Sequence, residues 1–268
     1  MMKKQTLLPL LLVLVSMMWT DSVSASVTIG WVNYTKTGYI TGEGITGSVY
    51  YDAENKVLTL DNAHIKSVNT VLIVTDIGMK LVVKGDCSLT CESIGQTTIS
   101  SGAPMTITGS GTLTIESQGT AIASLITSSL TLTIEGCTVV AHGSYNGIVS
   151  VEYKPILVIR NATVKALGTE YGSIWGWGDI KLEGCKIEQP VDATFGEDSM
   201  GKCVMKDGNR VKSEVVIVPD ATGITHPTAD VPTPKDGVYT LGGEYLGTNV
   251  DSLPRGVYIV GGKKIIKN

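Results

Sequence analysis

Apolar and polar residues alternate in short runs over most of this chain, and Gly or Asn interrupts the runs. The clearest examples are "LTIEGCTVVAHG" at 132–143 and "LVIRNATVKALG" at 157–168, which repeat one order of residues twenty-five positions apart. Such alternation predicts half-buried strands. Gly and Asn tolerate positive φ better than other residues. Each run therefore predicts two short strands that meet at a corner.

The pattern occurs six times along the chain. The copies begin at Leu58, Leu81, Met105, Leu132, Leu157 and Ile180. Successive starts lie 23, 24, 27, 25 and 23 residues apart. A period in the twenties with alternating strands is typical of solenoids, in which each repeat buries its apolar face against the next. We predict an all-β fold, a right-handed parallel β-helix of about six coils with a short β-hairpin tail.

Composition and charge narrow the picture further. The chain is 43% hydrophobic but holds one Phe, so its core must be built from Ile, Val, Leu and Thr, which favour strands. The net charge is −4 and no basic run occurs, which makes nucleic acid and acidic membranes poor partners.

The two ends of the chain differ from the repeats. Lys3 and Lys4 precede a short apolar run and small residues that end at Ala25, a pattern typical of a cleaved secretory signal peptide. We expect an exported protein with no transmembrane segment after cleavage. The expected parts are a signal peptide 1–25, an N-terminal β cap 26–57, the β-helix 58–190, a C-terminal β cap 191–218, a Pro/Thr-rich linker 219–235 and a β tail 236–268.

Small residues follow the predicted corners. This position holds Ala63, Cys87, Cys137, Ala162 and Cys185. Because Ala and Cys interchange there, we interpret the cysteines as small buried residues rather than ligands or nucleophiles. Cys137 and Cys185 lie two coils apart, about 9.5 Å, which is too far for a disulfide. The pairing of Cys91 and Cys203 stays open.

The outward position before each corner carries Glu135, Arg160 and Glu183 in successive coils. We predict a ladder of opposite charges on neighbouring strands. The alternative is that Arg160 serves as the base of a polysaccharide lyase, an activity known in right-handed β-helices that needs a metal-bound carboxylate or paired acids.

Other candidate catalytic groups do not assemble into a site. The remaining aspartates and histidines considered are Asp61, Asp76, Asp86, Asp179, His64, His142 and His226. The aspartates form no pair at a repeated offset, and the histidines complete no Ser/His/Asp or Cys/His arrangement. We therefore predict no catalytic residue, no metal ligand and no cofactor.

Aromatic residues mark the late part of two coils. If Gly147, Val149 and Val151 of one coil face inward, alternation puts Gly172, Ile174 and Gly176 of the next coil inward as well, and the residues between them face outward. The residues expected to form an outward aromatic face are Tyr145, Tyr171, Trp175 and Trp177. Exposed rings on a rigid sheet suit stacking against sugar rings, so this face is the candidate glycan-binding site. The alternative is that a C-terminal cap covers the tryptophans, or that they form an ordinary contact patch.

The repeats also resemble a known group of proteins. "GSVYYDAENKVLTLDNAHI", "MTITGSGTLTIES", "LTIEGCTVVAHG" and "LVIRNATVKALG" are similar to exported bacterial β-helix proteins described as carbohydrate-binding-domain-containing, over roughly residues 26–190. The matched positions are structural, so no functional residue carries over. The resemblance implies a polysaccharide or surface glycan as partner, and for some relatives calcium, although this chain lacks a dense carboxylate cluster.

The tail resembles the end of type IX secretion sorting domains. The matching residues are Gly256, Tyr258, Lys263, Lys264 and Lys267. This resemblance implies contact with a secretion machinery and a place outside, or on the outer surface of, a Gram-negative bacterium. The alternative is a hairpin that folds back on the helix.

We expect a non-catalytic glycan-binding or surface-interaction protein. Two other functions stay open: a structural adhesin that binds proteins, and a polysaccharide lyase or hydrolase of the β-helix type.

Overall fold

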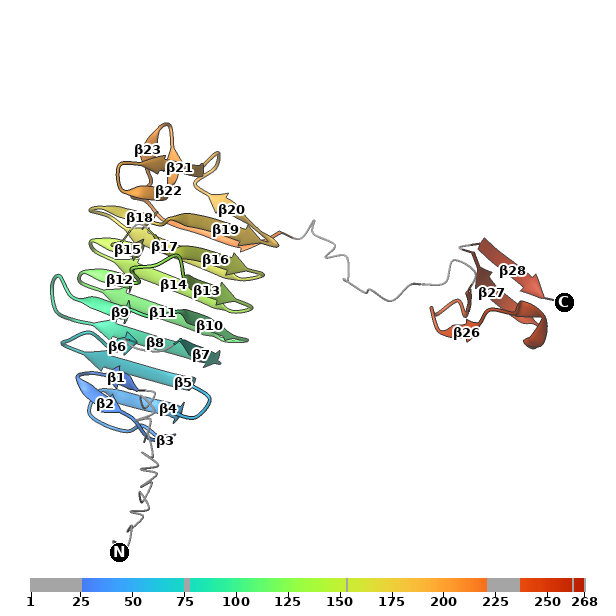
Figure 1. Cartoon of the computed structure of the whole chain (residues 1–268), viewed down its shortest axis with the longest axis horizontal. Coiled ribbons are helices and arrows are strands. Elements are labelled where there is room, and N and C mark those ends of the chain that lie inside the picture. Colours follow the sequence, from blue (N-terminus) through green and yellow to red (C-terminus); the bar gives the residue numbers. More distant parts are fainter. Residues whose placement is uncertain (1–25, 75–77, 153, 221–236, 262, 268) are drawn as a thin grey trace, which may run out of the picture. The chain divides into compact units, whose positions relative to one another are not determined.

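The computed structural model describes residues 26–74, 78–152, 154–220, 237–261 and 263–267 (Figure 1). The expected signal peptide, His226 and Asp76 lie outside these residues. The contacts divide the chain into two units, residues 1–223 and 224–268, which are described separately below. No helix in the described ranges is long and apolar enough to cross a membrane.

The first unit is a parallel β-helix of five complete coils. Its N-terminal cap consists of β1 (Val27–Ile29), β2 (Val32–Tyr34), β3 (Gly38–Tyr39) and β4 (Ile45–Asp52). The first coil is formed by β5 (Val57–Ser67) and β6 (Leu72–Val74). The next four coils are β7 (Met79–Lys84), β8 (Asp86–Cys91), β9 (Thr97–Ser101); β10 (Met105–Gly109), β11 (Thr112–Ser117), β12 (Thr120–Ser124); β13 (Thr131–Glu135), β14 (Thr138–Gly143), β15 (Asn146–Ser150); and β16 (Ile156–Arg160), β17 (Thr163–Gly168), β18 (Gly172–Trp175).

Equivalent strands of successive coils lie side by side and parallel (Figure 1). One stack runs β6, β9, β12, β15, β18, and the two arms of each coil form the stacks β7, β10, β13, β16 and β8, β11, β14, β17. The long strand β5 joins these two arms because it pairs with both β7 and β8. Inward Leu, Ile and Val side chains of all three stacks form one continuous core. The predicted fold class is confirmed.

The corner residues have the backbone conformation that the sequence predicts. The fifth position of each repeat has positive φ in all six copies, at Asn62, Gly85, Gly109, Gly136, Asn161 and Gly184. The values at Asn62 and Asn161 are 46° and 43°. Only Gly and Asn adopt such angles at low cost, so these residues turn the chain between the two arms of each coil.

The register differs from the predicted one in the second coil. Leu81 pairs with Ile107 rather than with Met105, and Met105 pairs with Met79. The same two-residue difference makes Cys87 pair with Leu113 rather than share a position with Cys137. A shift by two residues keeps every side chain on its face of the strand, so alternation alone cannot detect it.

The sixth repeat ends the parallel stack. β19 (Asp179–Glu183) pairs with β16 in parallel, as its repeat predicts. β20 (Cys185–Gln189) instead pairs with β24 (Val215–Pro219), an antiparallel strand that lies between β20 and β17. The returning strand β24 thus covers the edge of β17 that would otherwise accept another coil.

A small antiparallel sheet follows β20 and forms the C-terminal cap. It consists of β21 (Thr194–Asp198), β22 (Gly201–Lys206) and β23 (Asn209–Arg210). A second hydrophobic cluster joins Cys203 of this cap to Ala123, Val149 and Trp175, which lie on β12, β15 and β18. The cap therefore covers part of the outer face of the third stack.

The second unit is a four-stranded antiparallel sheet. Its elements are β25 (Val238–Tyr239), β26 (Tyr245–Gly247), the 3-10 turn Val250–Ser252, β27 (Gly256–Val260) and β28 (Lys263–Lys267). The strand order is β26-β25-β27-β28, so β27 and β28 form the predicted hairpin.

Candidate functional site

The two tryptophans are not exposed, and the expectation of an open tryptophan face is wrong. Trp175 is 9% exposed and Trp177 is fully buried. Trp175 does point away from the core residue Ile174, as alternation requires, but the C-terminal cap covers it. β18 ends at Trp175, and Gly176 turns the chain with a positive φ of 82°. Strand alternation therefore no longer applies to Trp177. Its side chain belongs to the main hydrophobic core, and its backbone pairs with Lys202 of the cap. The alternative that the cap covers the tryptophans is therefore confirmed for Trp175.

The expected inward positions of Val149 and Val151 are also wrong, and Val151 is 43% exposed. Val149 pairs with Trp175, and Ile148 pairs with Ile174. The chain between these strands is one residue longer than the predicted offset, so Val149 joins the tryptophan on the outer face under the cap.

Trp175 fastens the cap to the last complete coil. The guanidinium carbon of Arg210 lies 4.0 Å from the centre of the Trp175 ring, and the indole nitrogen donates to Asn146 Oδ1 at 2.9 Å. Arg210 also pairs with Asp198. Partial burial opposes ionisation of Asp198, but hydrogen bonds from the Met200 amide and from Arg210 outweigh it and lower the pKa of Asp198. These contacts are structural.

The predicted tyrosine stack is present. The rings of Tyr145 and Tyr171 meet edge to face with centroids 5.8 Å apart, and the Tyr171 amide donates to the Tyr145 carbonyl at 3.0 Å. Tyr171 is 48% exposed and Tyr145 is partly exposed. Arg210 Nη1 donates to the Tyr171 carbonyl at 3.0 Å, so the cap also holds the backbone of this pair.

The tyrosines follow a corner of the β-helix that repeats in every coil. We call this corner the corner groove and define it as the residues at and just after the ends of β5, β8, β11, β14 and β17. Backbone hydrogen bonds connect this corner from coil to coil: Glu92 donates to Ser67, Gln118 to Cys91 and Ser144 to Ser117. Equivalent positions therefore repeat at about 4.8 Å, the spacing of hydrogen-bonded strands.

One hollow of about 270 Å³ lies in the corner groove, and its lining residues Ser144 and Thr169 come just before Tyr145 and Tyr171 in the sequence. Polar side chains line most of it: Glu116, Ser117, Gln118, His142, Ser144 and Thr169. They offer carboxylate, hydroxyl, amide and imidazole groups within one or two coils of the exposed rings.

His142 is the best-connected side chain of this hollow. Its Nδ1 lies 3.3 Å from Glu116 Oε1, and its Nε2 lies 3.2 Å from Glu214 Oε1. Glu116 sits at the matching position of the preceding coil, because β11 and β14 pair Glu116 with His142. Sequence reasoning missed this group. The repeat offset could have pointed to Glu116, but nothing local indicates Glu214, which precedes β24.

The charged ladder on the other arm is confirmed. Arg160 Nη1 lies 2.9 Å from Glu135 Oε2, and Arg160 Nε lies 2.5 Å from Glu183 Oε2. Hydrogen bonds and charge from Glu183, followed by those from Glu135, raise the pKa of Arg160. An arginine held between two carboxylates stays protonated and is poorly suited to act as a base.

The remaining candidate groups stay apart. His64 Nδ1 lies 2.9 Å from Ser88 Oγ of the next coil. Asp61 bonds the side chain of Asn62, and Asp179 accepts from the Ile180 amide. Among the described residues, no three His, Cys, Asp or Glu side chains are placed to hold one metal ion.

All five cysteines are free. Four are buried, and Cys185 is partly exposed. Burial, reinforced by the charge of Glu135, raises the pKa of Cys137 to about 11. Cys137 is therefore an inert small residue of the coil rather than a nucleophile.

In the tail, the five residues that resemble a sorting signal differ in environment. The buried Tyr258 donates from its hydroxyl to the Pro254 carbonyl at 2.8 Å, and Gly256 lies against this ring. Lys267 Nζ donates to the carbonyls of three residues around the 3-10 turn, Val250, Asp251 and Leu253. Lys263 and Lys264 are exposed on the edge strand β28.

No family model, curated protein or solved structure matches the chain significantly. Its class therefore comes from the fold itself: the chain is a parallel β-helix protein with an appended antiparallel sheet.

Proposed function

We propose that this protein is an exported, non-catalytic glycan-binding β-helix that holds a polysaccharide in the corner groove. The observation that carries the proposal is the Tyr145–Tyr171 pair, in which Tyr171 is 48% exposed, next in the sequence to residues that line the polar hollow. Tyrosine rings offer an apolar surface to sugar rings and a hydroxyl to their polar groups. With the tryptophans covered, the tyrosines are the part of the original aromatic face that a sugar can reach.

The hollow supplies the second requirement of a sugar site, a few placed polar groups. Its hydroxyl, amide and carboxylate groups can donate to and accept from sugar hydroxyls. His142 holds Glu116 and Glu214 in place by contacting both. Because the corner repeats from coil to coil, it offers similar polar positions in series to a polymer.

Two other functions remain candidates. A structural adhesin would use the same exposed tyrosines to contact proteins. A polysaccharide hydrolase would use Glu116 and Glu214 as its pair of acids. Binding to proteins but to no glycan would mark the adhesin, and release of shortened or unsaturated sugars would mark an enzyme.

Export and surface attachment form part of the proposal. They rest on the signal-like residues 1–25 and on the resemblance of the tail to sorting domains, where Lys263 and Lys264 are available to a secretion machinery. Deletion of residues 236–268 should leave the protein inside the cell envelope, as protease treatment of intact cells would show. Normal surface exposure of the deleted form would contradict the role of the tail.

The test of glycan binding is Tyr145→Ala combined with Tyr171→Ala. Retention on a panel of polysaccharides in affinity electrophoresis should fall about tenfold or more, because each lost stack weakens binding by roughly 1 kcal/mol. The matched control is Tyr239→Ala with Tyr245→Ala, a tyrosine pair of the second unit with centroids 5.3 Å apart. Circular dichroism should show an intact fold in both. Equal retention by the groove variant and the parent would overturn the proposal.

A further inference from the structure

The seven-stranded sheet of the first unit differs at its two ends. At β18 the C-terminal cap continues the hydrogen bonding, because the Ser173 amide donates to the Val211 carbonyl at 2.9 Å. At the other end β2 pairs with β1, and no strand in the described ranges pairs with its outer edge. β2 therefore presents main-chain groups of the kind that pair with an extended chain.

The residues of β2 do not protect this edge. Edge strands often carry charged residues or Pro, which discourage pairing with another chain. β19 and β20, the outer strands of the larger sheet, carry such charges at Lys181 and Lys186. β2 consists of Val32, Asn33 and Tyr34, which are uncharged, and Val32 is 52% exposed. The edge is short, but it is open to a partner strand.

An apolar crevice of about 210 Å³ lies against one face of β2. Val32 and Tyr34 both line it, and residues two apart share one face of a strand. The other apolar residues of the lining are Ile29 of β1, Ile45 of β4 and Ile65 of β5. A strand added to β2 would place every second side chain on this face, over the crevice.

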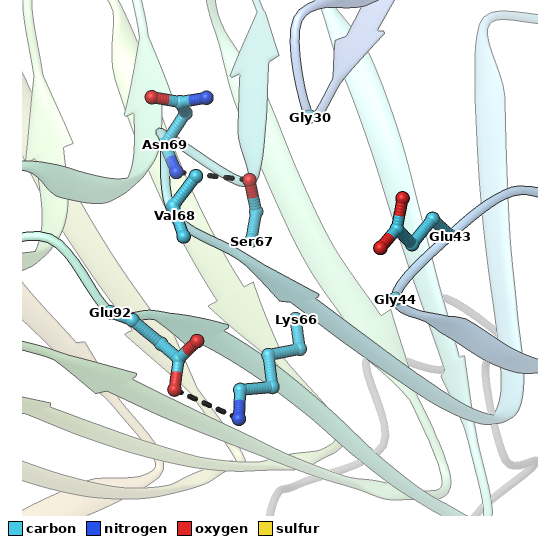
Figure 2. A pocket seen from close by; sticks show the side chains of 8 residues that line it. All are labelled: Gly30, Glu43, Gly44, Lys66, Ser67, Val68, Asn69 and Glu92. Carbon is cyan, nitrogen blue, oxygen red and sulfur yellow. Dashed lines mark hydrogen bonds and ion pairs between the residues drawn. The ribbon is translucent and has the colours of Figure 1, made fainter.

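The charges beside the crevice favour a basic partner. The crevice shares Gly30, Glu43, Lys66 and Ser67 with an adjoining cavity of about 510 Å³, which Figure 2 shows. Lys66 Nζ lies 2.8 Å from Glu92 Oε1, so these two charges are paired. Glu43 stands apart from this pair (Figure 2), and its side chain has no hydrogen bond or ion pair with another described residue. A positively charged group in the crevice would therefore find a carboxylate that is not already paired.

We infer that β2 and the crevice form a docking site for an extended, basic segment of another protein. The segment pairs with the edge of β2 and directs an aliphatic side chain to the isoleucines and a basic side chain to Glu43. A second copy of this chain fits poorly as the occupant, because its β2 has no basic residue and it brings a second Glu43. The inference goes beyond glycan binding, since it uses neither the tyrosine pair nor the hollow at His142.

Synthetic peptides provide the measurement. The probe is the fluorescein-labelled peptide Thr-Ile-Thr-Arg-Thr-Ile-Thr, in which isoleucine and arginine share one face of an extended chain. The control peptide has Glu in place of Arg. In fluorescence anisotropy the arginine peptide should bind saturably, and the glutamate peptide should bind about tenfold more weakly, because its carboxylate meets Glu43. Equal binding of the two peptides, or binding of neither, would overturn the inference.

Glu43→Gln tests the charge of the site. It should weaken binding of the arginine peptide about threefold to fivefold and strengthen binding of the glutamate peptide, since it removes an exposed ion pair and a like-charge contact. Glu54→Gln, at an exposed glutamate of the same cap, is the matched control and should change neither affinity. If Glu43→Gln behaves like this control, the basic partner is refuted.

N-methylation of the probe tests the main-chain pairing. An extended peptide presents the amides of alternate residues to each of its edges. One probe is methylated at the threonine amides and another at the isoleucine and arginine amides. One of the two should lose binding, because a single edge of the peptide pairs with β2. Loss of binding in both peptides, or in neither, would overturn strand addition.

Two further measurements separate this site from the alternatives. Tyr145→Ala with Tyr171→Ala should bind the arginine peptide as the parent does, whatever happens to polysaccharide retention. A loss of peptide binding in this variant would move the peptide site to the tyrosines and refute the β2 site. Analytical ultracentrifugation should show no dimer of the parent that Val32→Lys dissociates. Such a dimer would identify a second copy as the occupant and overturn the inference.

Discussion

Arg210 of the C-terminal cap stacks on Trp175 of the last complete coil, with 4.0 Å between the guanidinium carbon and the ring centre. The same arginine pairs with Asp198 and donates to the Tyr171 carbonyl. One side chain thus connects the cap, the end of the β-helix and the backbone of the tyrosine pair.

Replacement of this arginine tests how the cap is held. Arg210→Ala should lower the free energy of unfolding by about 1–3 kcal/mol, because a partly buried cation–π contact and a charge-assisted pair are lost. Lys206→Ala, at the exposed last residue of β22, is the matched control. Thermal unfolding measures the stability, and acrylamide should quench the tryptophans of Arg210→Ala more strongly. Equal quenching in both variants would show that the cap does not depend on Arg210.

The positive φ of the corner residues predicts that two substitutions of Gly136 differ sharply in their cost in stability. Gly136→Val should cost roughly 1–3 kcal/mol, because a β-branched residue is strained at φ 68°. Gly136→Asn should cost much less, since Asn62 and Asn161 occupy the same position in other coils. Chemical denaturation of the two variants gives the comparison. Similar losses would argue against positive φ as the reason for Gly and Asn at the corners.

Cys137 predicts a specific pH dependence. Its pKa is raised by burial from 9.0 to about 11, so the folded state keeps the thiol proton longer than the unfolded state. The resulting stability is fully present below pH 9 and is lost as pH rises through the folded value. Relative to Cys137→Ala, the free energy of unfolding of the parent should fall by about 2–3 kcal/mol between pH 9 and about pH 11. Chemical unfolding of the parent and of Cys137→Ala at pH 8 and pH 11 measures this difference. An equal loss of stability in the two proteins would contradict it.

The Arg160 ladder predicts a small and salt-dependent effect. Its three side chains are 31–45% exposed, and such pairs contribute at most about 1 kcal/mol. Arg160→Ala should therefore melt slightly earlier at low ionic strength and nearly equally in high salt. Retention of polysaccharides should not change, because the ladder lies on the other arm of the coil. A loss of retention would move the glycan site to this face.

The periodic part of the molecule follows from the sequence. A residue in a β-helix meets the residue one coil away, so the offset of about 25 residues predicts its neighbour without knowledge of the remaining chain. This reasoning correctly predicts the Glu135–Arg160–Glu183 ladder, the Tyr145–Tyr171 pair and the positive φ of Asn62 and Asn161. Each depends only on alternation, on coil length and on the backbone freedom of Gly and Asn.

Contacts that depart from the repeat are decided by the tertiary structure. Trp175 points outward as predicted, yet the cap, a non-repeating segment, folds back and buries it. The two-residue register shift at Leu81 preserves the buried face and leaves no trace in the pattern. Glu214 reaches His142 from outside the repeats. Contacts within the repeats follow from local spacing, whereas contacts with the caps depend on where distant segments pack.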